Sequence, residues 1–144
     1  MIAARSILYP VIAMVVLTTV VSIVMYRRRI AEMRAKHLPP QAVASATQMA
    51  TKLEDTRAAD NFRNLFETPV LFYAAALVVY AAKLTDPLYL GLAWLYVAAR
   101  IVHSFIHCTS NVVLNRLTAF MTSWVLLWIL WGLIAWDLMV AGRG

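Results

Sequence analysis

Residues 117–136 read LTAFMTSWVLLWILWGLIAW, a run of 20 residues without a charge that lies between Arg116 and Asp137. A helix needs about 20 mostly apolar residues to cross a bilayer, so this run alone predicts a membrane-spanning helix. Residues 6–26, SILYPVIAMVVLTTVVSIVMY, form a second uncharged run of 21 residues and predict another. These two runs decide the fold class, because a soluble domain of this size cannot bury so many apolar side chains.

Two further spans are expected in the middle of the chain, although charged residues interrupt them. Residues 68–82 carry no charge, and they reach spanning length only if the helix also takes in Glu67. Residues 87–108 are long enough to span with Arg100 inside the membrane, and Asp86 suits the N-cap of that helix. We therefore expect an all-α, integral membrane four-helix bundle that forms one domain over residues 1–144. The expected spans are residues 6–28, 63–83, 87–108 and 116–139.

The composition supports this fold class and excludes several others. Of the 144 residues, 62% are hydrophobic and 14% are charged, whereas a soluble domain is about 45–50% apolar and about 25% charged. Disorder, a collagen-like fibre and a secreted disulfide scaffold are excluded. Cys108 is the only cysteine, so no intrachain disulfide can form, and we expect a buried, inert thiol.

The net charge of +6 is explained by membrane topology, and no nucleic-acid partner is expected. Basic residues collect on the cytoplasmic side of membrane helices. With four spans, nine Lys and Arg residues fall on the side of the long first loop and three on the other. The nine are Arg27, Arg28, Arg29, Arg34, Lys36, Lys52, Arg57, Arg63 and Arg116, and the three are Arg5, Lys83 and Arg143. The count predicts a cytoplasmic first loop and both termini outside the cytoplasm, in a bacterial inner membrane or the endoplasmic reticulum.

A first polar cluster opens the second expected span. Arg63, Asn64 and Glu67 are spaced to share one face of a helix. One interpretation is an Arg63–Glu67 ion pair at the membrane surface. The other is a binding site in which Arg63 and Asn64 take carboxylate and peptide groups while Glu67 takes an ammonium. Pro69 cannot donate to the helix ladder and is expected to bend the entry to this span.

A second cluster runs along the third expected span. Its polar residues recur at helical spacing on one face; they are Tyr96, Arg100, His103, His107 and Asn111. Arg100 either extends toward the cytoplasmic surface or lines a polar cavity, and the length of the stripe favours a cavity. His103 and His107 also have metal-ligand spacing, but their helix offers only two ligands, so we expect pocket residues and no metal.

A third feature is Arg116, at the start of the last span. It is either a cytoplasmic anchor for the helix or a cation at the mouth of the cavity. In the second case its guanidinium can lower the pKa of a thiol and hold a thiolate ready for attack.

Taken together, these motifs resemble the MAPEG family, the membrane-associated proteins in eicosanoid and glutathione metabolism. The resemblance rests on four short helices, a basic first loop, Arg63-Asn64-x-x-Glu67, Arg100-x-x-His103 and Arg116, and it covers almost the whole chain. It implies homotrimers that bind glutathione between subunits near the cytoplasmic side. It also implies a glutathione-dependent transferase or peroxidase of the microsomal type, whose lipophilic second substrate arrives from the bilayer.

The resemblance also implies roles for individual residues. Arg63, Asn64 and Glu67 would hold the glutathione backbone. Arg100 and His103 would line its pocket, and Arg116 would stabilise the thiolate without a metal. The resemblance matches Arg28 to a further basic position. His107 stands where a tyrosine usually contacts glutathione and can still donate a hydrogen bond.

Other positions depart from the family pattern. Asp60 stands where an extra arginine is often found, Phe120 replaces a pocket tyrosine, and Leu117 follows Arg116 where a serine can occur. These departures leave open a non-catalytic protein of the same fold. A small proton-coupled transporter is a third hypothesis, which the position of Glu67 near the cytoplasmic end of its helix disfavours.

Overall fold

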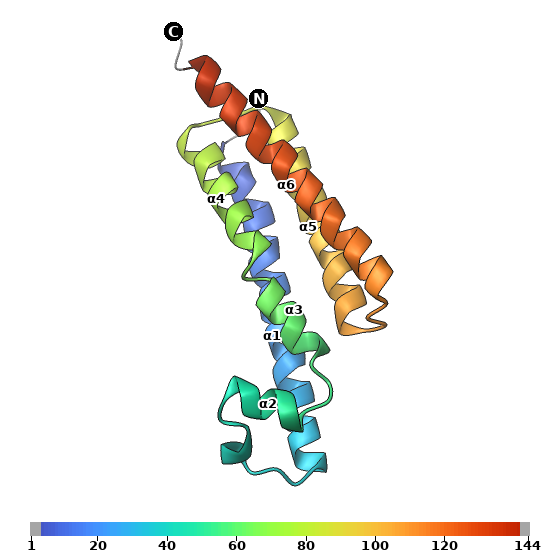
Figure 1. The fold of residues 1–144 in the computed structure, drawn as a ribbon. Coiled ribbons are helices and arrows are strands. Elements are labelled where there is room, and N and C mark those ends of the chain that lie inside the picture. The colour runs from blue at the N-terminus through green and yellow to red at the C-terminus, as the bar shows by residue number, and fades with distance from the viewer. Residues whose placement is uncertain (1–3, 142–144) are drawn as a thin grey trace.

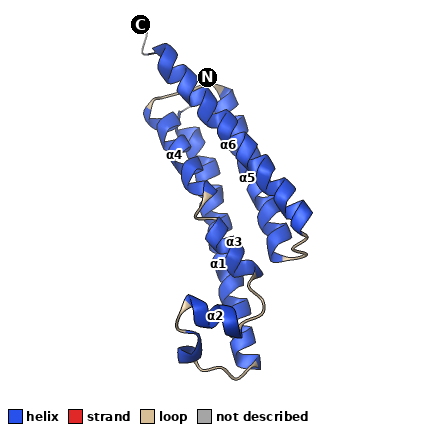
Figure 2. Ribbon diagram, in the orientation of Figure 1, coloured by secondary structure: helices blue, strands red, loops and turns tan. Residues whose placement is uncertain are grey.

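The computed structural model describes residues 4–141, and in this range the chain is helical with no strand (Figures 1 and 2). Its elements follow one another in the order η1 Ala4–Ile7, α1 Leu8–Ala35, η2 Pro40–Val43, α2 Ala46–Lys52, α3 Arg57–Asn64, α4 Thr68–Ala81, α5 Pro87–Cys108 and α6 Val113–Ala141. Arg143 lies outside the described residues.

Four helical segments are long and apolar enough to cross a membrane, as the sequence predicts. They are Arg5–Ala35, Arg57–Ala81, Pro87–Cys108 and Val113–Val140. The start of α1 and the end of α6 lie at the same end of the bundle, and α2 lies at the opposite end (Figure 1). That arrangement agrees with an even number of spans. The chain is therefore an all-α multi-pass membrane protein, and the side of the membrane on which its termini lie stays a prediction.

The third span begins as the sequence predicts. Asp86 precedes α5, and its side chain accepts a hydrogen bond from the backbone N–H of Leu88 at 2.8 Å. The span also ends at Cys108 as expected, but the polar stripe does not continue along it to Asn111, which adopts a φ of 50° in the following turn. Asn tolerates this left-handed conformation better than most residues. Asn111 is therefore a turn residue and not the last member of a helical stripe.

The second span is broken, and one prediction about its polar cluster is therefore wrong. The helix ends at Asn64, tight turns follow, and α4 starts at Thr68 with Pro69 in its first turn. A proline at this position has no N–H to donate and clashes with the carbonyl four residues earlier. Arg63 and Glu67 consequently do not share one continuous helix face.

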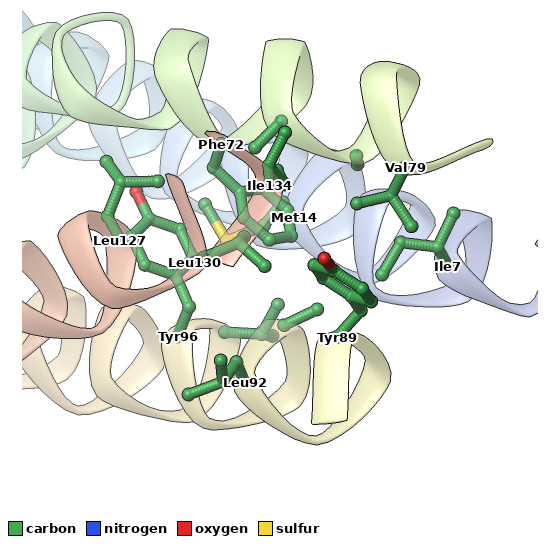
Figure 3. Close-up of a cluster of buried hydrophobic side chains, with 14 of the residues drawn as sticks. Ile7, Met14, Phe72, Val79, Tyr89, Leu92, Tyr96, Leu127, Leu130 and Ile134 are labelled. Atoms are coloured by element: carbon green, nitrogen blue, oxygen red, sulfur yellow. The ribbon is translucent and has the colours of Figure 1, made fainter. Parts of the chain in front are cut away.

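A hydrophobic core fills the bundle between α1, α4, α5 and α6. Figure 3 shows Phe72 of α4 near Leu130 of α6, and Val79 of α4 pointing toward Tyr89 of α5. The rings of Phe72 and Tyr96 stack with their centroids 4.5 Å apart. Large apolar side chains on the outer faces of the helices are exposed, as expected of surfaces that meet lipid or another subunit.

Candidate functional site

The polar side chains of α5 form a buried column that continues from the core toward the α5–α6 turn. Tyr96, Arg100, His103 and His107 are each at most 7% exposed. The guanidinium of Arg100 is fully buried, so it does not extend to the surface. An arginine inside a span is costly unless polar groups surround it, and the column therefore marks the polar interior of the bundle.

Asn64 connects Arg100 to Glu67. Arg100 Nη2 donates to Asn64 Oδ1 at 2.6 Å, and Asn64 Nδ2 donates to Glu67 Oε2 at 2.9 Å. Arg63 does not join this chain of hydrogen bonds. Its side chain is 72% exposed, and its Nη1 lies 3.7 Å from Asp60 Oδ1. The carboxylate that approaches Arg63 is thus Asp60, one turn earlier on α3, because the helix breaks before Glu67.

Arg116 is held between both histidines. Its Nη1 donates to Asn111 Oδ1 at 2.7 Å and lies 3.3 Å from His107 Nε2. Its backbone carbonyl lies 3.1 Å from His103 Nδ1. A carbonyl accepts only and a guanidinium donates only, so we assign the proton to Nδ1 in both rings. Neutral groups therefore hold the guanidinium, and within residues 4–141 it forms no ion pair with a carboxylate.

These residues border a cavity of about 380 Å³ between α3, α5 and α6. Its lining residues are Asp60, Asn64, His103, His107, Val113, Arg116, Leu117 and Phe120. Small-molecule sites usually measure about 300–1,000 Å³ and combine apolar walls with a few polar groups. Two polar atoms of its histidines, Nε2 of His103 and Nδ1 of His107, are buried and have no partner in the described part of the chain. With the tautomers assigned above, a ligand that satisfied both would have to donate to His103 Nε2 and accept from His107 Nδ1.

Some residues that the sequence singles out do not line this cavity. Arg63 and Glu67 have exposed side chains, and Arg100 lies behind Phe120, with its guanidinium carbon 5.8 Å from the centre of that ring. Arg28 lies elsewhere, because its Nη1 contacts Asp55 Oδ2 at 3.3 Å. In residues 4–141 no group of three His, Cys, Asp or Glu side chains is arranged to hold a metal ion.

Asp55 organises a separate network at the junction of the first loop. Arg57 Nε donates to Asp55 Oδ1 at 2.8 Å, and Arg57 Nη1 donates to the backbone carbonyl of Thr109 at 2.7 Å. The hydrogen bond from Arg57, together with the charge of Arg28, holds the pKa of Asp55 below its ordinary value. The network fastens the loop to α1 and to the end of α5.

Sequence reasoning missed a second buried group, which lies beside Cys108. Asn61 is fully buried, and its Nδ2 donates to Cys108 Sγ at 3.3 Å while Ser104 Oγ donates to its Oδ1 at 3.3 Å. The only signal in the sequence is a single polar residue four positions after Arg57, which no pattern distinguishes from a surface residue. Cys108 itself is half-buried.

The comparisons with known proteins agree with this architecture. Searches of curated proteins and of solved structures each gave no significant match. A model of the MAPEG family matches residues 7–136, nearly the whole chain. The chain therefore belongs to the MAPEG family of membrane proteins.

Proposed function

We propose that this chain is a glutathione-dependent membrane transferase or peroxidase that acts on lipophilic electrophiles or lipid hydroperoxides. The observation that carries the proposal is the setting of Arg116. Its guanidinium borders a cavity of ligand size and is held only by an amide and a neutral imidazole. Within residues 4–141 no carboxylate forms an ion pair with it. Such a cation stabilises a thiolate over a thiol.

The chemistry proposed for Arg116 is nucleophilic. The thiol of glutathione loses its proton to solvent, and the thiolate stays beside the guanidinium. In a transferase the thiolate attacks an electrophilic carbon, forming a C–S bond as the leaving group departs with the bonding electrons. In a peroxidase it attacks the terminal hydroperoxide oxygen, the O–O bond breaks, and the alkoxide leaves and takes a proton to become the alcohol. A second glutathione then attacks the sulfenic acid, forming the disulfide and releasing water. Both routes gain from a lowered thiol pKa.

The walls of the cavity support an apolar second substrate. Val113, Leu117 and Phe120 line it beside Arg116. Leu117 also belongs to an apolar hollow of about 530 Å³ along α6, which continues to Leu126. A lipophilic electrophile can therefore approach the sulfur along α6 from the bilayer.

A homotrimer would account for the site residues that do not line the cavity of their own subunit. Arg63 and Glu67 expose their side chains at the α3–α4 break. Next to them, α1 and α4 form an apolar groove of about 410 Å³ that includes Val15, Phe66 and Leu77. We propose that a second copy covers this surface and that Arg63, Asn64 and Glu67, with Arg100, His103 and His107, contribute to glutathione binding in the assembly. Arg28 can contribute to glutathione binding only if its ion pair with Asp55 breaks.

The proposal is tested by the ultraviolet absorbance of thiolate when glutathione is added to the detergent-purified protein. We expect the wild type to develop a thiolate signal at neutral pH and Arg116→Ala to lose most of it. Arg34→Ala removes an exposed arginine of α1 and is the matched control, so it should behave as the wild type. A normal thiolate signal in Arg116→Ala would refute the role of Arg116. No signal at millimolar glutathione in the wild type would refute the function.

A further inference from the structure

We infer that Asp60, and not Glu67, is the carboxylate that binds the ammonium group of the thiol co-substrate. The inference rests on the proposed function and specifies the class of thiol that the site accepts. That class is a thiol whose far end is a free α-amino acid. Thiols without a cationic amine should therefore bind weakly as co-substrates.

The charges in the cavity lie on opposite walls. Its lining contains two charged residues, Arg116 on α6 and Asp60 on α3, and its other lining side chains are neutral. A ligand with an anion at one end and a cation at the other complements this arrangement. With the thiolate at Arg116, the cationic end lies toward Asp60.

Asp60 is available to a ligand. Its side chain is 44% exposed, and its ion-pair contact with Arg63 measures 3.7 Å, longer than a hydrogen bond. Its carboxylate oxygens therefore keep the capacity to accept hydrogen bonds from an ammonium. Attraction between charges in a partly buried cavity is also stronger than in bulk water.

Glu67 is placed less well for this role. Its side chain is exposed and does not border the cavity, and its Oε2 already accepts a hydrogen bond from Asn64 Nδ2 at 2.9 Å. It lies beyond the end of α3, in the turn that leads to α4. Asn64, and not Glu67, contacts the cavity at this point.

The pairing of Asp60 with Arg63 defines the shape of the group it binds. An α-amino acid carries its ammonium and its carboxylate on one carbon atom. Asp60 and Arg63 present the complementary charges 3.7 Å apart on adjacent turns of α3. The ammonium then contacts Asp60 inside the cavity, and the α-carboxylate on the same carbon atom extends past the cavity edge toward the exposed side chain of Arg63. The γ-glutamyl end of glutathione carries such a group.

The test compares two thiols that differ only in the ammonium. Glutathione is titrated against glutaryl-cysteinylglycine, which lacks the amino group but keeps both carboxylates and the thiol. The full chain in detergent is used, and the dissociation constants come from thiolate absorbance. We expect the wild type to bind glutathione at least about tenfold more tightly, the effect of one charged hydrogen bond.

Variants then identify the carboxylate responsible. In Asp60→Asn the ratio of the two dissociation constants should fall to about 1–2, and Asp60→Glu should restore most of it. Glu67→Gln is the matched comparison. In this variant the ratio of the two dissociation constants should stay at its wild-type value, even if both thiols bind more weakly. Asp60→Ser replaces the Asn variant if the latter does not yield folded protein.

The outcomes separate this inference from the function on which it rests. An unchanged ratio in the folded Asp60 variant, or loss of the ratio in Glu67→Gln, overturns the assignment to Asp60 while thiolate formation still supports the enzyme. Equal binding of the two thiols by the wild type also overturns it. Absence of a thiolate signal with both thiols overturns the proposed function, and the assignment to Asp60 with it.

Discussion

The hydrogen bond between Asn64 and Arg100 should be among the polar contacts that contribute most to the stability of the bundle. Arg100 is fully buried, and Asn64 Oδ1 accepts from its Nη2 at 2.6 Å. Its Nε and Nη1 have no partner in the described part of the chain. Replacing Asn64 by Leu leaves the buried charge without this acceptor, which should cost about 2–4 kcal/mol of unfolding free energy.

The companion substitution, Arg100→Met, should cost much less. It leaves Asn64 Oδ1 without its donor, but it also removes a buried charge that is incompletely paired. We expect a loss of about 0–2 kcal/mol, since apolar replacement of buried charges is often tolerated. Once Arg100 is gone, Asn64→Leu should add little. The double-mutant cycle should therefore give a coupling energy of about 1.5–3 kcal/mol.

The assay is equilibrium unfolding by sodium dodecyl sulfate in mixed micelles, followed by tryptophan fluorescence. Asn115→Leu, at an exposed position of α6, is the matched control and should change the unfolding free energy by no more than about 0.5 kcal/mol. A coupling energy below about 0.5 kcal/mol would show that the two side chains act independently. The bridging role of Asn64 would then be refuted.

Two further predictions concern contacts outside the cavity. In Asp55→Asn, the thermal midpoint should fall less between pH 5 and pH 3 than in the wild type. The lowered pKa of Asp55 stabilises the folded protein at pH values above the ordinary pKa of 3.8. This stability is lost as the pH falls through the folded-state pKa. An equal fall of the thermal midpoint in the variant and the wild type would contradict the prediction. Tyr89→Phe removes a 2.7 Å hydrogen bond to Asp137 and should cost about 1.5–3 kcal/mol in the same unfolding assay. Tyr80→Phe, at a side chain that is 46% exposed, should cost no more than about 0.5 kcal/mol, and equal losses in the two variants would contradict the prediction.

The features that the sequence predicts well are those that local pattern determines. The long uncharged runs identify the spans because hydropathy and length decide insertion. The sequence predicts Asp86 as an N-cap because a cap depends on its immediate neighbours. The common burial of Arg100, His103 and His107 follows from the regular 100° step of one unbroken helix.

The features that sequence reasoning missed depend on breaks and on distant contacts. Arg63 approaches Asp60 instead of Glu67 because the helix is interrupted for three residues between α3 and α4, just before Pro69. Arg28 contacts Asp55, 27 positions away across the first loop, and helical spacing carries no information about such a pair. The position of Asp60 at the cavity likewise appears only when α3 is packed against α5 and α6 closes the other side of the cavity.

The energetics of the buried column argue for a binding site and against a purely structural role. Arg100, His103 and His107 leave polar atoms without partners in the described part of the chain, and each such atom costs about 1–3 kcal/mol. A bundle that needed only to be stable would do better with apolar residues of similar volume at these positions. His103, His107 and Arg116 all line one cavity. A ligand that donates to His103 Nε2, accepts from His107 Nδ1 and carries negative charge beside Arg116 would recover part of this cost, so its binding should stabilise the folded protein by an amount that grows with the logarithm of ligand concentration above its dissociation constant.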